Sequence, residues 1–221
     1  MEKASLVVLI SGSGSNLLAI IDAIKNRQLN AEIKAVISNK ETAKGLDHAK
    51  RENISTYVVD HKQYSSREAF DQAIIEIIDP IKPDLVILAG FMRILSKNFI
   101  ARYQHRLINV HPSLLPKYKG LNTHQLAIDN NDEVHGASVH YVSFELDSGP
   151  VVIQAEVPVL SSDTAEILAA RVLSEEHKIY PMAIEMHING RISFDKDVLK
   201  LDNKTLTKPL LWKNNKLIQS T

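Results

Sequence analysis

The chain of 221 residues contains no cysteine. Disulfide bonds, thiolate metal sites and a cysteine nucleophile are therefore excluded. The chain also lacks an excess of charge of either sign, because 26 Lys and Arg residues balance 26 Asp and Glu residues. A general nucleic-acid-binding protein usually carries a basic excess, so we expect no nucleic-acid partner, and any anion site must be local.

Long apolar stretches are missing as well. The longest, around Leu85 to Met92, is far too short to span a bilayer, and we expect no membrane partner. The first ten residues faintly resemble a signal peptide, but the acidic Glu2 and the polar run after Ile10 favour a buried first strand. We therefore expect a cytoplasmic protein.

Strand and helix patterns alternate along the first half of the chain. Such alternation predicts an α/β fold: a single-domain open, mostly parallel sheet with helices on both faces, with later strands partly antiparallel. The expected strands are residues 6–10, 32–38, 56–59, 85–89, 107–110, 137–142 and 151–157. The expected helices are residues 17–24, 45–53, 65–78, 96–102, 124–130 and 163–190.

Several residues mark the expected ends of these helices. Ser65, with Glu68 three residues later, forms a capping-box pattern, and Ser96 is a further capping candidate. The last helix is expected to start at Asp163 and to end at Gly190, and to be kinked or restarted at Pro181. We expect one catalytic domain over residues 1–190. Residues 191–221 are expected to extend the same domain with short strands around turns at residues 195–197 and 202–203.

A glycine-rich turn, Ser11 to Asn16 (SGSGSN), stands between the first strand and the first helix. Glycine lets the backbone approach a ligand closely, and the helix N-terminus beyond it suits a phosphate. The turn is no full dinucleotide fingerprint, because Leu17 stands where a third glycine belongs, and no Gly-Lys-Ser/Thr of a P-loop follows. A phosphate site, a merely tight turn and a nicotinamide dehydrogenase all remain open at this point.

Asn109 and His111 lie two residues apart at the end of a predicted strand, so both side chains should face the same way. An amide and an imidazole aimed at one point can stabilise a carbonyl oxygen that becomes an oxyanion. Asp147 follows in a loop with Ser148 and Gly149, and a carboxylate near His111 would favour the imidazolium form. A structural histidine and a simple turn aspartate explain the same spacing, which does not decide between the two readings.

Other chemistries lack their patterns. None of the nine histidines stands in an H-E-x-x-H or comparable arrangement, so we expect no metal. No G-x-S-x-G segment is present, which argues against a serine hydrolase.

Longer segments carry a resemblance to a known family. These are LISGSGSNL (9–17), ILAGFMRIL (87–95), INVHPSLLPKYKG (108–120), HGASVHYV (135–142) and ELDSGPVV (145–152). From Leu6 to about Pro181 the chain resembles the glycinamide ribonucleotide formyltransferases, the folate-dependent transformylases of purine synthesis. The HPSLLP stretch is shared by the wider formyltransferase group.

The resemblance implies a Rossmann-like formyltransferase fold and an enzyme that moves a formyl group from 10-formyltetrahydrofolate, its co-substrate, to the amine of glycinamide ribonucleotide. It implies three catalytic residues, Asn109, His111 and Asp147. The positions implied for the ribonucleotide are Gly14, Ser15, Asn16 and Glu176. Those implied for the folate are Arg67, Met92, Arg93, Ile94, Leu95 and Asn109, and the loop of Ser143, Phe144, Glu145, Leu146 and Asp147.

The sequence departs from the family pattern at two positions, Phe144 and Asn122, which often hold an acidic residue and a histidine. The tail after Arg191 matches weakly. Two other enzymes share this core sequence. Methionyl-tRNA formyltransferase would need an extra RNA-binding domain, and formyltetrahydrofolate hydrolase would need an additional N-terminal regulatory domain. A hydrolase-like enzyme and a non-catalytic nucleotide-binding module remain the alternatives, and a monomer and a homodimer are both open.

Overall fold

The computed structural model describes residues 2–218. The chain divides into two compact units, residues 1–109 and residues 110–221. In the first unit the strands follow the order β5-β4-β1-β2-β3, and every neighbouring pair is parallel. The strands are β1 (Ala4–Ile10), β2 (Ala31–Ser38), β3 (Thr56–Val58), β4 (Leu85–Leu88) and β5 (Leu107–His111). The side chains from Leu6 to Ile10 are fully buried, as expected of a strand that is covered on both faces.

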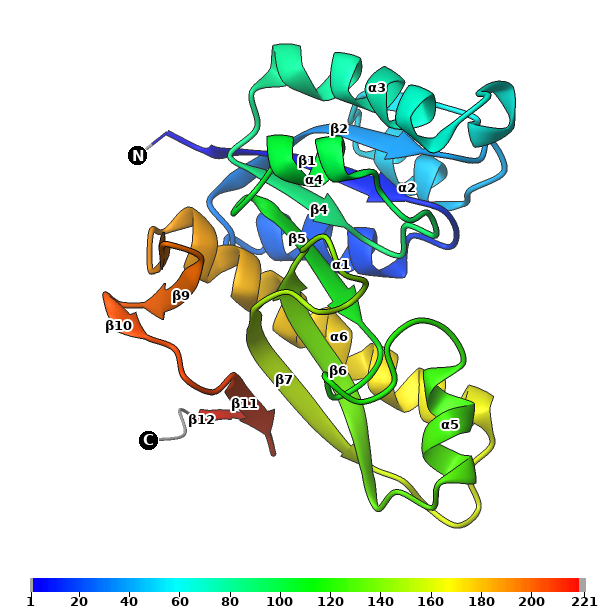
Figure 1. The fold of residues 1–221 in the computed structure, drawn as a ribbon, viewed down its shortest axis with the longest axis vertical. Coiled ribbons are helices and arrows are strands. Elements are labelled where there is room, and N and C mark those ends of the chain that lie inside the picture. Colours follow the sequence, from blue (N-terminus) through cyan, green and yellow to red (C-terminus); the bar gives the residue numbers. More distant parts are fainter. Residues whose placement is uncertain (1, 219–221) are drawn as a thin grey trace. The chain divides into compact units, whose positions relative to one another are not determined.

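Helices lie on both sides of these strands, as predicted. Helix α1 packs with α2, and α3 packs with α4, while Figure 1 shows α1 and α3 on opposite sides of β1 and β4. The helices are α1 (Ser15–Lys25), α2 (Gly45–Arg51), α3 (Arg67–Ile78) and α4 (Lys97–Arg102), with short 3-10 turns at His61–Gln63 and Asp79–Ile81.

Two of the predicted helix starts need correction in this unit. The cap of α3 is Ser66 rather than Ser65, because the extended backbone of Ser66 lets its hydroxyl accept the N–H of Ala69 at 3.1 Å. Helix α1 begins at Ser15, two residues before its expected start, with Gly14 as the preceding residue. The prediction for Ser96 is confirmed, since its hydroxyl accepts the N–H of Phe99.

The second unit is built on an antiparallel hairpin of β6 (Val134–Tyr141) and β7 (Val151–Pro158). The long helix α6 (Ala165–Ile188) packs on both strands and contacts α5 (Thr123–Asp129). Figure 1 shows α6 running behind the hairpin. The mostly parallel sheet of the first unit and this antiparallel pair confirm the predicted α/β class.

Helix α6 differs from its prediction at two points. Its cap is Thr164, and Asp163 instead accepts hydrogen bonds from the N–H of Leu160 and the guanidinium of Arg171. The helix is not restarted at Pro181, although proline removes one backbone donor. Pro181 lies on the buried face of α6, and the packing of that face on β6 and β7 offsets the missing bond. Gly190, with φ of +70°, follows the end of the helix as predicted.

The tail forms short strands, as expected. An antiparallel sheet contains β8 (Ile192–Asp195), β9 (Val198–Leu201) and β10 (Lys204–Thr205). Strand β11 (Leu210–Lys213) then pairs in parallel with β7, and β12 (Lys216–Ile218) pairs with β11. Side chains fasten the tail to the hairpin and α6: Trp212 Nε1 donates to Glu175 at 2.8 Å, and Lys213 pairs with Glu156 at 2.7 Å. The domain boundary at residue 190 stays a prediction.

No helix among residues 2–218 has the length and apolar character needed to cross a membrane.

Candidate active site

The glycine turn of the first unit is fixed by a second glycine. Gly14 has φ of +75°, and a Cβ atom there would lie 2.4 Å from the Cα of Gly45. The N–H of Gly45 also donates to the carbonyl of Gly12 at 3.1 Å. Only residues without a side chain allow this approach, so the start of α2 holds the turn in place.

The turn leads into the N-terminus of α1. The N–H of Leu18 makes the first intrahelical bond, to the carbonyl of Gly14 at 2.9 Å, so the N–H groups of Ser15 and Asn16 precede the helical ladder. The first turn contains no acidic side chain. A helix N-terminus of this kind carries partial positive charge and suits an anion such as a phosphate.

The segment from Met92 to Leu95 lies between β4 and α4 in the same unit. Met92 and Ile94 are 60% and 57% exposed, whereas Leu95 is buried. The N–H of Met92 donates to the hydroxyl of Ser11 at 2.7 Å. This segment therefore presents apolar side chains to solvent from an anchored backbone. Arg67, another predicted folate position, is the first residue of α3 and is exposed.

Asn109 and His111 both belong to β5, and the division between the two units falls between them in the chain. Asn109 is half-buried and His111 is 5% exposed. The alternation of a strand directs both side chains to the same face of β5, as the spacing predicts.

Within the second unit, the structure brings His111 and Asp147 together across 36 residues of sequence. Nδ1 of His111 lies 3.4 Å from Oδ2 of Asp147, and Nε2 lies 2.8 Å from the carbonyl oxygen of Tyr118. Each ring nitrogen of His111 therefore lies next to an oxygen atom that can accept a hydrogen bond. Oδ2 of Asp147 also accepts the N–H of Gly120 at 2.9 Å.

The loop that carries Asp147 is held from both sides. Asp147 itself has φ of +46°, a left-handed conformation that aspartate adopts more readily than most residues. A Cβ atom on Gly149 would lie 1.8 Å from the carbonyl oxygen of Tyr141, so this position admits only glycine. On the other side, Lys119 donates to the hydroxyl of Ser148 at 2.6 Å. These contacts define the position of the carboxylate.

A second histidine lies beside this carboxylate. Nε2 of His140 is 3.7 Å from Oδ1 of Asp147, and its Nδ1 is 2.9 Å from the carbonyl oxygen of Tyr141. Burial lowers the pKa of His140, although these two partners oppose the shift, so the ring is neutral near pH 7. The strand pairing shifts register between Val139 and His140, an irregularity of the kind that re-aims side chains beside active sites.

Two more histidines, His124 and His135, contact each other in the same unit. Nε2 of His135 lies 3.2 Å from Nδ1 of His124. Burial, together with a smaller effect of the charge of His124, lowers the pKa of His135 to about 4. At least one of the facing nitrogens must act as acceptor, so at least one of the two rings is neutral.

The remaining predicted positions lie on separate elements. Glu176 is on α6 and only 7% exposed. The loop from Ser143 to Leu146 joins β6 to β7, and Phe144 and Leu146 are more than half exposed. No group of three His, Asp or Glu side chains within residues 2–218 is arranged to hold a metal ion.

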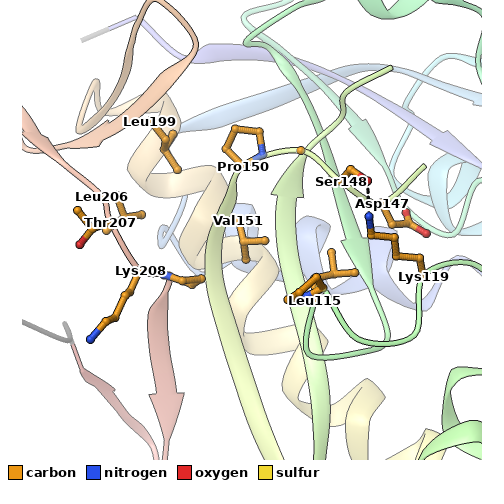
Figure 2. A pocket seen from close by; sticks show the side chains of 13 residues that line it. Leu115, Lys119, Asp147, Ser148, Pro150, Val151, Leu199, Leu206, Thr207 and Lys208 are labelled. Atoms are coloured by element: carbon orange, nitrogen blue, oxygen red, sulfur yellow. Dashed lines mark hydrogen bonds between the residues drawn. The ribbon is translucent and has the colours of Figure 1, made fainter. Parts of the chain in front are cut away.

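A cavity of about 370 Å³ lies next to the Asp147 loop in the second unit. Figure 2 shows Lys119, Ser148 and Asp147 on one side and side chains of the C-terminal tail on the other. The tail therefore contributes a wall of this cavity. The lining residues are Leu115, Pro116, Lys119, Asp147, Ser148, Gly149, Pro150, Val151, Leu199, Leu206, Thr207, Lys208 and Pro209.

Comparisons with known proteins identify the family of this chain. The formyl transferase family profile matches residues 4–184. The chain belongs to the formyl transferase family. This formyl transferase is 50% identical over 202 residues to the phosphoribosylglycinamide formyltransferase of Escherichia coli strain K12, covering 91% of this chain and 95% of that protein.

Two further relatives extend the comparison. A structure of the phosphoribosylglycinamide formyltransferase of Coxiella burnetii, in complex with CHES, matches with a TM-score of 0.89 at 46% identity. That match covers 93% of this chain and 97% of the other. The human trifunctional purine biosynthetic protein adenosine-3 is 44% identical over 191 residues, which cover 86% of this formyl transferase but 19% of the human protein.

Sequence reasoning missed several residues that shape the site of this formyl transferase. Gly45, Tyr118, Gly120 and His140 all act through backbone groups or through a partner distant in sequence. Asp71 was also missed, although it stands four residues after Arg67 on the predicted helix, where an acidic residue on the buried face was a usable signal.

Proposed function

We propose that this protein transfers the formyl group of 10-formyltetrahydrofolate to the amine of glycinamide ribonucleotide. The observation that carries the proposal is the contact of Asp147 with His111, on the strand that also holds Asn109. The 50% identity to a phosphoribosylglycinamide formyltransferase supports the choice of acceptor.

In this proposal the ribonucleotide phosphate binds at Gly14, Ser15 and Asn16. The glycine-fixed turn and the partial positive charge of the α1 N-terminus support that assignment. The buried carboxylate of Glu176 accepts hydrogen bonds from the glycinamide portion. A buried carboxylate suits such a role because each of its oxygens accepts hydrogen bonds without donating any.

The folate binds to residues that suit its chemistry. Met92 and Ile94 offer exposed apolar surface, whereas Leu95 is buried. Arg67 and Arg93 carry cationic groups that attract the glutamyl carboxylates. The pteridine ring contacts the backbone of one loop, which consists of Ser143, Phe144, Glu145, Leu146 and Asp147. Asn109 faces the formyl group.

The chemistry is a direct transfer. The neutral amine attacks the formyl carbon, and the bond between that carbon and the folate nitrogen breaks. The amine loses one proton, and the departing folate nitrogen gains one. Asn109 and protonated His111 donate to the formyl oxygen as negative charge develops there, and Asp147 keeps the imidazole charged. Because Nε2 of His111 contacts the carbonyl of Tyr118, that contact must first exchange for the substrate oxygen. Holding two reactants together can lower the barrier by about 7–11 kcal/mol in favourable geometry.

The test is an absorbance assay of folate deformylation, with and without glycinamide ribonucleotide. We expect turnover only when the ribonucleotide is present. Equal turnover without it would identify a hydrolase, and binding without turnover would identify a passive module. The cytoplasmic location stays a prediction, and both a monomer and a homodimer stay open.

A further inference from the structure

A buried carboxylate in the first unit connects the two elements that we assign to the folate. Asp71 lies on α3 and is 1% exposed. Its Oδ2 accepts the N–H of Ser96 at 2.5 Å, directly after the segment from Met92 to Leu95. Asp71 is therefore attached to the end of that segment although 25 residues separate the two partners in sequence.

Arg67 lies on the same helix as Asp71. The two residues are four apart on α3, which places their side chains on the same side of the helix. Burial raises the pKa of the Asp71 carboxyl, while the hydrogen bonds from Ser96 and the charge of Arg67 act in the opposite direction. Arg67 is thus close enough for its charge to stabilise the carboxylate.

The other end of the segment is anchored in a similar way. The N–H of Met92 donates to the hydroxyl of Ser11, which donates in turn to Oδ1 of Asn39 at 2.5 Å. Ser11 and Asn39 are both buried. The backbone is thus anchored at both ends of the segment by a buried side-chain acceptor. Ser11 accepts the N–H of Met92, the first residue of the segment, and Asp71 accepts the N–H of Ser96, which follows its last residue.

We propose that Asp71 is a positioning residue that ties α3, the helix that begins at Arg67, to the segment Met92–Leu95 in the arrangement that binds the folate. The exposed side chains of Met92 and Ile94 have few neighbours to fix them, so their positions depend on the anchored backbone. The inference rests on the proposed formyl transfer only for the identity of the ligand.

The decisive variant is Asp71→Asn, because asparagine keeps an acceptor for the N–H of Ser96 but removes the negative charge of the carboxylate. The amide NH2 group then takes the place of Oδ1, a buried atom that has no hydrogen-bond partner among the described residues. We expect the KM for 10-formyltetrahydrofolate to rise roughly tenfold, which corresponds to about 1.4 kcal/mol. The kcat and the KM for glycinamide ribonucleotide should stay within about twofold of wild type.

The matched control is Asp79→Asn, in the turn that follows α3. Asp79 pairs with Arg102 of α4, so this variant also removes a carboxylate between the two helices but does not touch residues 92–96. We expect its folate KM to equal that of wild type. If Asp71→Asn does not fold, Ser11→Ala tests the other anchor and should raise the folate KM in the same direction.

An unchanged folate KM in a folded Asp71→Asn protein overturns the inference, as does an equal rise in both KM values, which would indicate general loosening. Calorimetric titration with tetrahydrofolate separates this outcome from failure of the proposed function. Should the wild-type protein bind tetrahydrofolate but show no turnover that depends on the ribonucleotide, the proposed function falls. Weaker tetrahydrofolate binding by Asp71→Asn would still support the positioning role.

Discussion

Oδ2 of Asp147 lies between Nδ1 of His111, at 3.4 Å, and the N–H of Gly120, at 2.9 Å. One carboxylate oxygen thus orients the imidazole and is itself oriented by the neighbouring loop. We predict that Asp147→Asn is folded but loses activity, because an amide cannot keep His111 charged. The kcat should fall by about 10²–10³, the typical loss for one oxyanion donor.

The same assay applied to His111→Ala and Asn109→Ala should give losses of similar size. Circular dichroism and thermal melting must first show that the variants are folded. Near-normal turnover in a folded His111→Ala protein would remove the catalytic role of this residue.

Gly45→Ala should weaken ribonucleotide binding although Gly45 is outside the predicted binding positions. A Cβ atom there would lie 2.6 Å from Cδ1 of Ile10 and 2.9 Å from Cα of Gly14, so the glycine turn must move. We expect the KM for glycinamide ribonucleotide to rise by about tenfold or more, with a smaller change in the folate KM. The exposed neighbour Lys44, changed to alanine, is the control. Equal KM values for Gly45→Ala and wild type would contradict the proposed phosphate site.

Acid should destabilise the protein through His135. The folded-state pKa of this buried side chain is about 4, against an ordinary value of 6.5, so the unfolded chain binds the proton more readily. The stability that the folded protein owes to neutral His135 is fully present above pH 6.5 and is lost as the pH falls towards 4. Between pH 7.5 and 5 we expect the unfolding free energy to drop by about 1–3 kcal/mol from this residue.

Urea unfolding of wild type and His135→Gln at both pH values measures this contribution. Glutamine does not titrate, so the variant should lose less stability on acidification than wild type. The same loss in both proteins would assign the effect to other groups, such as His140, whose pKa burial also lowers.

Asp163→Asn should lower the melting temperature at neutral pH. The carboxylate of Asp163 accepts two hydrogen bonds from Arg171 and one from the N–H of Leu160, and the Arg171 bonds lower its pKa to about 2. Its stabilising effect is therefore present above the ordinary pKa of 3.8 and is lost only as the pH falls towards 2. Asp195→Asn, which breaks the exposed pair with Lys200, is the matched control and should melt like wild type. Identical melting of the two variants would contradict this role.

Much of the fold follows from sequence because the relevant signals are local. The continuous apolar runs of β1 and β4 identify strands covered on both faces, and Ser96 identifies the start of α4. Of the two effects predicted for Pro181, the restart of the helix is wrong, because the packing of the buried face of α6 outweighs the missing backbone bond, while the kink stays a prediction. The predicted cap of α3 was wrong by one residue. Ser65 and Ser66 have identical side chains, so only the backbone conformation decides which of them caps the helix.

The candidate site was predictable where it depends on a strand or a motif, and not where loops form it. The spacing of Asn109 and His111 places both on one face of β5. Their relation to Asp147 required a resemblance, since spacing carries no information about a loop 36 residues away. The contacts of His111 with the Tyr118 carbonyl and of Asp147 with the Gly120 N–H involve backbone groups, which every residue has.

The parallel pairing of β11 with β7 has a consequence for handling the protein. A chain shortened after residue 190 would lack β11 and leave one side of β7 with unpaired backbone donors and acceptors. Exposed strand edges of this kind recruit other chains, so such a fragment should self-associate even where its predicted catalytic residues are intact.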